Sequence, residues 1–506
     1  MIWKQLEKIA LLGTERSTLT PTMQETLNDK GINTDQEITK TVLEAVAYYA
    51  PLQKAGWQPK VWEGKLLAPS KEVNQQACSN KSRQHLATIL EKYPKLVSEF
   101  IEGMQANNKC IPPELLPPLF EKALKDEILW SQLENSIGER GKWLLPLNPA
   151  WNKLRSDYSI EEWTLGTRLL RLALLKKTRR TNSKEGLTLL QSTWETDGVK
   201  EKAPLLKVLS IGLSIHDEAF LEVCLNFPRK EIRKIARDLL IQLPASQLHQ
   251  RIQTELAKLV TFVKKEETII LSLPEANNKA LIRDGIDPKK KGASSKVEVN
   301  MLAQMMEIVA PTFWEEHFGT TPIQIIQLFA NSDRSLFLVN AIIEAIALHQ
   351  SREWIEAMVH FWYTNYLQEN WQALAMKPIF ETFPNDLFNE LVYKKLQATK
   401  VMPDEQAPLM LLLQIENQKW SKPLSLIVMN LLQEWIRRNP SFSYSGMEYR
   451  SLLKNQAAYA IAPNLYPKMS ELWLVDQRGW AGWESDIQRF LNTLSFRRSA
   501  LVELAK

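Results

Sequence analysis

The sequence has little glycine and no long apolar run. Glycine supplies 17 of the 506 residues, against a usual share of about 7%. No Asn-Gly or Asp-Gly dipeptide lies between alternating apolar segments, as a tight β-hairpin requires. A run of 18 apolar residues is also missing, and the N-terminal segment lacks the long apolar stretch of a signal peptide. We therefore expect a mainly helical, soluble protein that is neither exported nor held in a membrane.

Cysteine is scarce, and neither sign of charge dominates. Cys78, Cys110 and Cys224 are odd in number, lie far apart, and form no CxxC or Cys/His spacing. This pattern argues against a disulfide framework or a structural zinc site and predicts a reducing, cytoplasmic location. The 63 lysines and arginines exceed the 58 acidic residues by only five. So small an excess, spread over the whole chain, is unlike the clustered basicity of a dedicated nucleic-acid binder.

The segment 203–251 indicates the fold, because it reads as short amphipathic helices broken at regular intervals by turn residues. In its middle helix, apolar residues recur at helical spacing and form one continuous stripe. The members of this stripe are Ile232, Ile235, Ala236, Leu239, Leu240 and Leu243. Such a helix buries its stripe only between neighbours. We therefore predict an all-α protein, an α-α superhelix of the HEAT/ARM-like solenoid kind.

The chain is long enough for more than one domain. Helical periodicity is lost over 277–297, where glycine, proline, serine and lysine gather. We predict an N-terminal helical domain over 1–276, with its repeats clearest at 160–255. A basic flexible linker or insertion is expected over 277–297. A C-terminal helical-repeat domain then follows over 298–506.

Catalytic signatures are missing from the sequence. It contains no phosphate-binding GxxxxGK[ST] loop, no GxGxxG, no HExxH and no GxSxG. None of the six histidines falls three or four residues from another, so a metal site would need ligands from distant helices. We predict no catalytic residue, no metal site and no cofactor.

Two short segments are candidate binding sites. Glu15 and Arg16 closely follow Gly13, while Glu139 and Arg140 follow Gly138 and precede Trp143 and Trp151. A glycine followed by a charged pair suggests a helix end that projects a guanidinium group, which would suit recognition of a peptide or nucleotide. The structural alternative for each arginine is that it binds carbonyl or carboxylate groups of a neighbouring helix layer. For the tryptophans, the structural alternative is that their rings fill gaps between helices.

Two basic clusters are candidate contacts for a polyanion. The first, Lys176, Lys177, Arg179 and Arg180, lies at the end of a predicted helix, where cations also offset the negative end of the helix dipole. The second is the triplet Lys289, Lys290 and Lys291 in the predicted linker.

Several of these motifs occur in one order along the chain. They are LLGTER over 11–16, GERGKWL over 138–144 with Asn148-Pro149 and Trp151, Gly212-Leu213-Ser214 with Asp217-Glu218, and the helix over 230–244. Together they resemble a bacterial domain-of-unknown-function family of HEAT-like proteins. The resemblance is good over 1–255 and weaker beyond it. Where the family pattern has an Asp-Pro, before Trp194, this chain has Arg180-Thr181-Asn182.

Members of that family are commonly encoded beside a SWIM zinc-finger protein, a MoxR-type AAA ATPase and a von Willebrand A domain protein. The resemblance therefore implies protein partners, with the ATPase and the von Willebrand A protein as candidates. The family has no assigned catalytic residues, so none is carried over to this sequence.

Two functional hypotheses follow, from different classes. The first is a non-enzymatic helical-repeat scaffold that mediates protein–protein interactions. The alternative is a HEAT-type nucleic-acid-binding protein with a groove like that of some DNA glycosylases, which would hold a duplex through cations and tryptophans. Cations converging on one face would favour the alternative. Scattered charges would favour the scaffold, with only weak electrostatic affinity for nucleic acid.

Overall fold

The chain forms two compact units, residues 1–69 and 70–506. The structure, a computed structural model, describes residues 2–56, 68, 70, 76–155, 163–164, 166–290, 296–368, 371, 374–439, 446–473 and 482–506. Helices dominate both units, which confirms the all-α prediction. Among the described residues, no helix is both long enough and apolar enough to cross a bilayer.

The first unit contains three helices, α1 (Ile2–Leu12), α2 (Pro21–Asn28) and α3 (Ile38–Ala55). Its core is small and apolar, with Leu6, Met23, Leu27, Val42 and Ala45 fully or almost fully buried. Pro21 begins α2 because a proline at the first helical position loses no intrahelical hydrogen bond.

The second unit contains the remaining helices. Its first half has α4 (Asn80–Lys92), α5 (Val97–Ala106), α6 (Leu116–Ala123), α7 (Glu127–Leu133), α8 (Gly138–Leu144), α9 (Arg168–Thr181), α10 (Ser183–Trp194), α11 (Val199–Lys207), α12 (Glu218–Cys224), α13 (Lys230–Leu240) and α14 (Gln247–Leu259). Its second half has α15 (Lys279–Arg283), α16 (Val297–Ile308), α17 (Thr312–Phe318), α18 (Pro322–Ala330), α19 (Ser335–His349), α20 (Arg352–Asn365), α21 (Lys377–Thr382), α22 (Asn385–Thr399), α23 (Pro408–Leu413), α24 (Lys422–Arg438), α25 (Met447–Ser451), α26 (Ala458–Ala460), α27 (Tyr466–Leu472) and α28 (Glu484–Leu504).

Strands are short and few in the described part of the second unit. β1 (Gln76–Ala77) pairs in parallel with β2 (Lys109–Cys110), and β3 (Val260–Val263) pairs antiparallel with β4 (Thr268–Leu271). The β3–β4 hairpin turns through residues 264–267, where Glu267 has a φ of 50°. This turn contains no glycine, so the hairpin lacks the Asn-Gly or Asp-Gly dipeptide that would have predicted it from the sequence.

The apolar stripe of α13 is buried as predicted. Ile232, Ala236 and Leu240 have no exposed surface, and the other three members of the stripe are at most 9% exposed. All of them except Leu243 belong to one apolar core that extends from Trp163 to Leu494. The spacing of apolar residues therefore identified the buried face of this helix correctly.

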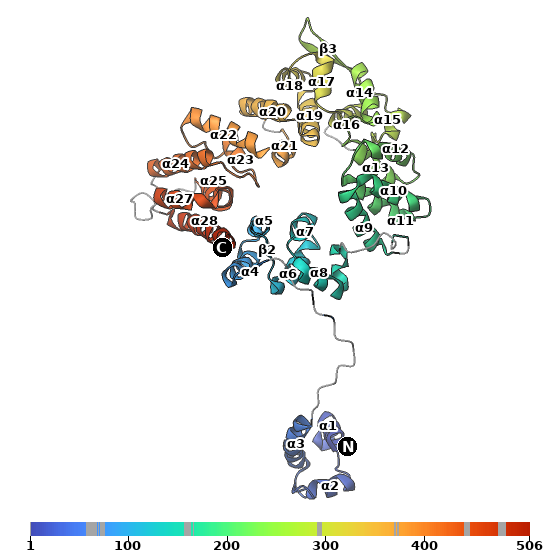
Figure 1. Ribbon diagram of the computed structural model, residues 1–506, viewed down its shortest axis with the longest axis vertical. Helices are drawn as coiled ribbons and strands as arrows, with labels where there is room; N and C mark the ends of the chain where they lie inside the picture. The colour runs from blue at the N-terminus through green and yellow to red at the C-terminus, as the bar shows by residue number, and fades with distance from the viewer. Residues whose placement is uncertain are drawn as a thin grey trace. The chain divides into compact units, whose positions relative to one another are not determined.

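The second unit returns on itself, so that its last helix packs against its first two. α28 contacts α4 and α5, and the helices between them follow one another around a circuit (Figure 1). Ala500 and Leu504 of α28 join the same core as Phe100 and Met104 of α5. Gly103 makes this approach possible, because a Cβ atom there would lie 2.9 Å from Leu501 Cδ2 and 3.1 Å from Leu504 Cδ1.

An ion pair strengthens this closure. Arg497 of α28 donates two hydrogen bonds to the Glu99 carboxylate of α5, at 2.8 and 2.6 Å. Its third nitrogen donates to the carbonyl oxygens of Ala458 and Ile461. Burial alone would raise the pKa of Glu99, but the hydrogen bonds and charge of Arg497 outweigh it and lower that pKa.

The described part of the predicted linker is a folded element. Residues 279–283 form α15, and Leu281 and Ile286 are buried in the same core as the helices before and after them. The boundary between the two compact units lies near residue 70. Residues 277–290 thus contain the packed helix α15, 291–295 lie outside the described residues, and the boundary expected at 277–297 stays a prediction.

Candidate functional site

The two predicted glutamate–arginine pairs belong to different units. Glu15 and Arg16 lie in a 3-10 turn (Thr14–Arg16) of the first unit, after Gly13 with a φ of 88°, and both are exposed. Glu139 and Arg140 belong to the second unit, in the first turn of α8. The sequence-based interpretation of 138–143 as a helix end is wrong, because Gly138 begins this helix.

The residues around Glu139 and Arg140 serve mainly to hold α8 and its neighbours in place. Glu139 forms an ion pair with Lys142, at 2.8 Å between Oε1 and Nζ, and Arg140 is exposed. Trp151 is buried against Phe120, and its indole nitrogen donates to Glu121. Trp143 is 36% exposed. For Trp151 the gap-filling alternative therefore fits better than a binding role.

Arg179 is not on the surface, although it was predicted to contact a polyanion. Its side chain is completely buried and makes a two-pronged ion pair with Asp217, at 2.8 and 2.9 Å. The same guanidinium donates to four backbone carbonyl oxygens, those of Ser183, Leu209, Ile211 and Gly212. Arg179 thus ties α9 to the turn before α12, and its charge is not available to a ligand.

The other three cations of that cluster line a cleft of about 270 Å³. The α9 residues that line the cleft share one face of the helix, because their spacings along the chain are one, three or four residues. They are Leu172, Ala173, Lys176, Lys177 and Arg180. Arg179 lies about 90° away from the centre of this face. It lies at the edge of the face, and its side chain pairs with Asp217 instead of lining the cleft.

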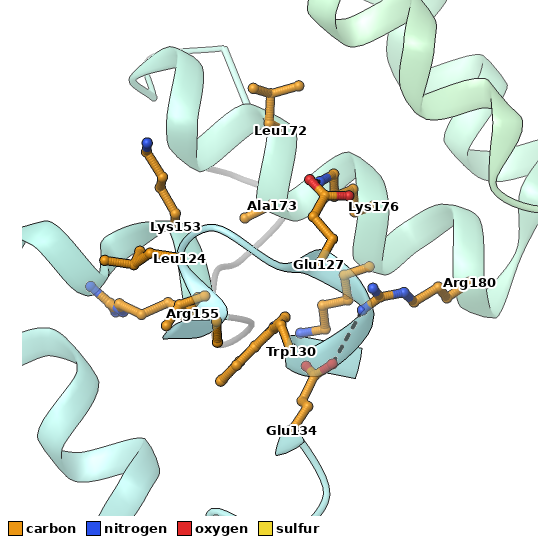
Figure 2. A pocket seen from close by; sticks show the side chains of 13 residues that line it. Leu124, Glu127, Trp130, Glu134, Lys153, Arg155, Leu172, Ala173, Lys176 and Arg180 are labelled. Atoms are coloured by element: carbon orange, nitrogen blue, oxygen red, sulfur yellow. Dashed lines mark hydrogen bonds and ion pairs between the residues drawn. The ribbon is translucent and has the colours of Figure 1, made fainter. Parts of the chain in front are cut away.

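The opposite walls of the cleft come from α6, from α7, and from η5 (Pro149–Leu154), a 3-10 helix. Figure 2 shows Lys153 and Arg155 on one side of the opening and Lys176 and Arg180 on the other. Trp130 of α7 lies between the two sides; it is 9% exposed and packs edge-on against Phe120. Leu124, Leu154 and Leu172 complete the apolar part of the lining.

The cleft is electropositive. Five cations line it, Lys153, Arg155, Lys176, Lys177 and Arg180, against two carboxylates, Glu127 and Glu134. Lys176 Nζ lies 2.6 Å from Glu127 Oε1, and Arg180 Nη1 lies 3.2 Å from Glu134 Oε2. The charges of Lys153 and Lys177, next to an apolar floor, are suited to a ligand that is both anionic and partly apolar.

The second predicted basic cluster is only partly described. Lys290 forms an ion pair with Glu307 of α16 at 3.1 Å, and Lys289 is exposed. Lys291 lies outside the described residues.

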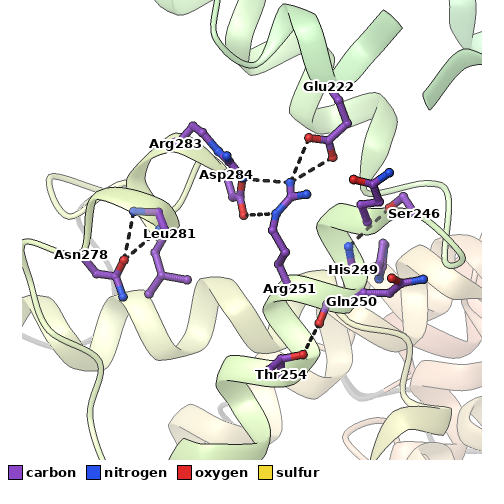
Figure 3. A network of polar contacts seen from close by, with 12 residues as sticks. Glu222, Ser246, His249, Gln250, Arg251, Thr254, Asn278, Leu281, Arg283 and Asp284 are labelled. Carbon is purple, nitrogen blue, oxygen red and sulfur yellow. Dashed lines mark hydrogen bonds and ion pairs between the residues drawn. The ribbon is translucent and has the colours of Figure 1, made fainter. Parts of the chain in front are cut away.

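A second polar cluster, which the sequence did not predict, ties α15 to α12 and α14 (Figure 3). Arg251 donates to both oxygens of Asp284, at 2.8 and 3.0 Å, and also to Glu222. Arg283 is a further donor to Asp284. The two cations and the two carboxylates balance, so this cluster holds 277–290 against the core and leaves no excess charge for a ligand.

The buried His249 of α14 meets the half-buried His349 of α19. The rings of His249 and His349 lie edge to face with centroids 5.4 Å apart, and each Nε2 is 2.8 Å from a backbone carbonyl oxygen. Burial lowers the pKa of His249 to about 4, against a small opposing effect of its hydrogen bond to Ile241. Burial lowers the pKa of His349 as well. Within the described ranges, no group of three His, Cys, Asp or Glu side chains is arranged to hold a metal ion.

We expect acid to destabilise the protein through this pair. The unfolded chain takes up a proton at His249 near pH 6.5, whereas the folded chain does so only near pH 4. The contribution of His249 to stability is therefore complete above pH 6.5 and is lost as the pH falls toward 4. Urea unfolding midpoints measured across this range should fall for the wild type and fall less for His249→Gln. His216→Gln, at an exposed position, should keep the wild-type slope, and equal slopes for all three proteins would contradict the assignment.

Comparison with known proteins places the chain in a family without assigning it a function. A family of unknown function (DUF5691) matches residues 5–504, nearly the whole chain. No curated protein and no solved structure matches it. The chain therefore belongs to this family, which agrees with the resemblance to a domain-of-unknown-function family.

Proposed function

We propose that the protein is a non-enzymatic, cytoplasmic scaffold, built as an α-α superhelix of the HEAT/ARM-like kind, that mediates protein–protein interactions. The observation that carries this proposal is the circuit of the second unit, in which pairs such as α12 and α13 or α16 and α19 pack together and α28 contacts α4 and α5. Stacked helices of this kind offer an extended, pre-organised surface, and binding to such a surface costs little ordering of the scaffold.

The polar chemistry of the interior supports a structural rather than a catalytic role. Active sites need perturbed, converging groups that remain available to a substrate. Here three acidic side chains each form an ion pair with an arginine. The pairs are Glu99 with Arg497, Asp197 with Arg171, and Asp217 with Arg179. Each of these pairs joins different elements of the fold, so packing accounts for the three carboxylates.

The candidate partners come from the family resemblance. A MoxR-type AAA ATPase and a von Willebrand A domain protein are the two that it implies. The alternative of a nucleic-acid-binding groove has less support, because Arg179 is internal and two of the cleft cations already pair with carboxylates.

A direct binding measurement tests the proposal. The full chain is immobilised, and the purified MoxR-type ATPase and von Willebrand A protein of the same genome are passed over it, with an unrelated protein of similar charge as the control. We expect saturable binding of at least one of the two candidates, with a Kd of roughly micromolar or below, as is usual for specific interfaces. Binding of neither candidate would overturn these partner assignments, and hydrolysis or transfer activity in the pure protein would overturn the non-enzymatic role.

A further inference from the structure

We propose that the cleft between α7, η5 and α9 receives an acidic segment of a partner protein, whose carboxylates pair with Lys153 and Lys177 while an apolar side chain covers Trp130. This inference rests on the proposed scaffold function, and it specifies the chemistry of one docking site. Charge complementarity and the nature of the cleft floor both point to such a segment, and the cleft has room for its apolar side chain.

The charges of the cleft are only partly used within the chain. Lys176 and Arg180 have Glu127 and Glu134 as partners. Lys153 and Lys177 are exposed, and the side chain of neither forms an ion pair or hydrogen bond with any residue that the structure describes. The two existing pairs show that carboxylates suit this surface, since α7 presents its own acidic side chains to the cations of α9. A partner that supplies further carboxylates would neutralise the remaining charge.

The floor of the cleft suits an apolar side chain. The cleft volume of about 270 Å³ leaves room for such a side chain and is close to the lower end of the roughly 300–1,000 Å³ that small-molecule sites occupy. Trp130, Leu124 and Leu172 give it an apolar floor. One apolar side chain seated on an aromatic floor and surrounded by charged groups is the usual arrangement of an interface anchor. The cleft therefore fits one anchor residue with acidic neighbours.

A nucleic acid fits the same cleft less well. A phosphate backbone needs several cations in a row and is repelled by carboxylates. Glu127, whose side chain is 86% exposed, and Glu134 both lie among the cations of the lining. Arg179, which would have extended the row along α9, is completely buried. The mixed charge of the lining thus favours a peptide, whose carboxylates are spaced by uncharged residues.

The test uses the full chain and a fluorescein-labelled synthetic peptide in which glutamates flank a central leucine. We expect saturable binding by fluorescence anisotropy that weakens as salt is added. Replacing the glutamates by glutamine should abolish binding, and replacing the leucine by serine should weaken it roughly tenfold, the effect of losing one anchor contact. A short duplex DNA carrying the same label is measured in parallel.

Two charge reversals locate the binding on the protein. Lys177→Glu removes an unpaired cation from the cleft and should weaken peptide binding at least about tenfold. Lys207→Glu changes the net charge equally at an exposed site on α11, outside the cleft, and should leave the affinity almost unchanged. Both lysines are exposed, and unchanged thermal melts will show that both variants fold.

Three results would overturn the inference. They are equal weakening by the two reversals, no peptide binding at all, and duplex binding that is tighter than peptide binding and is lost in Lys177→Glu. The last result would assign the cleft to nucleic acid. If a purified partner still binds the full chain while Lys177→Glu leaves that binding unchanged, the cleft assignment fails but the scaffold proposal stands.

Discussion

Asp217→Ala is expected to destabilise the second unit by about 3–5 kcal/mol, because it leaves a buried guanidinium without its counter-charge. The Arg179 side chain has no exposed surface, and both of its terminal nitrogens donate to Asp217. Asp217 also accepts the backbone N–H of Ser214 at 3.0 Å, so the substitution leaves a second donor unpaired. Urea unfolding followed by circular dichroism measures the effect as a lower midpoint.

A matched substitution at an exposed pair is the control. Asp386 forms an ion pair with Arg352, but its side chain is 71% exposed, so water replaces the lost partner. Asp386→Ala should therefore leave the midpoint nearly unchanged. If the two variants unfold at the same urea concentration, Arg179 is solvated in solution and the burial described for it is wrong.

Glu99→Ala is expected to have an effect of similar size, and to loosen the closure of the second unit. Arg497 is 1% exposed at its side chain, and Glu99 supplies its only carboxylate among the described residues. Removing that carboxylate should cost roughly 3–5 kcal/mol. Because this pair joins α5 to α28, amide hydrogen exchange should rise in α4, α5 and α28 before it rises in α13 or α14.

The exposed Lys95–Glu416 pair provides the comparison for this substitution. It has an N–O distance of 3.0 Å, with side chains 58% and 74% exposed. Like the Glu99 pair, it connects the N-terminal helices of the second unit with its C-terminal half. Glu416→Ala should leave exchange in α4 and α28 as in the wild type. A uniform rise across all helices in Glu99→Ala would mean that the substitution acts on global stability and not on the closure.

Features of the fold that depend on local periodicity could be predicted from the sequence. The stripe from Ile232 to Leu243 predicted the buried face of α13, because an apolar residue every three or four positions determines which side of a helix is covered. Helix periodicity alone does not separate Arg179 from the other three cations of its basic cluster, because it lies three residues after Lys176; its burial depends on Asp217, 38 residues away in the chain.

Features that depend on contacts between distant segments were not readable from the sequence. Residues 277–290 look like a linker because they contain Gly285 and Pro288. Arg251, which also pairs with Glu222, nevertheless holds Asp284 in a network that only the tertiary fold creates. The return of α28 to α5 depends on Gly103 and on the pair of Arg497 with Glu99, whose partners are 398 residues apart. No local pattern marks either arrangement.

The most direct test of the scaffold function compares protein and nucleic-acid binding at physiological salt. The full chain is titrated at about 150 mM salt with the purified MoxR-type ATPase, with the von Willebrand A protein and with duplex DNA. At this ionic strength the Debye length is about 8 Å, so loose electrostatic contacts are largely screened. We predict that a protein partner binds and that the duplex does not. Tight duplex binding that survives at this salt, with no binding of either protein, would contradict the scaffold function and support the nucleic-acid alternative.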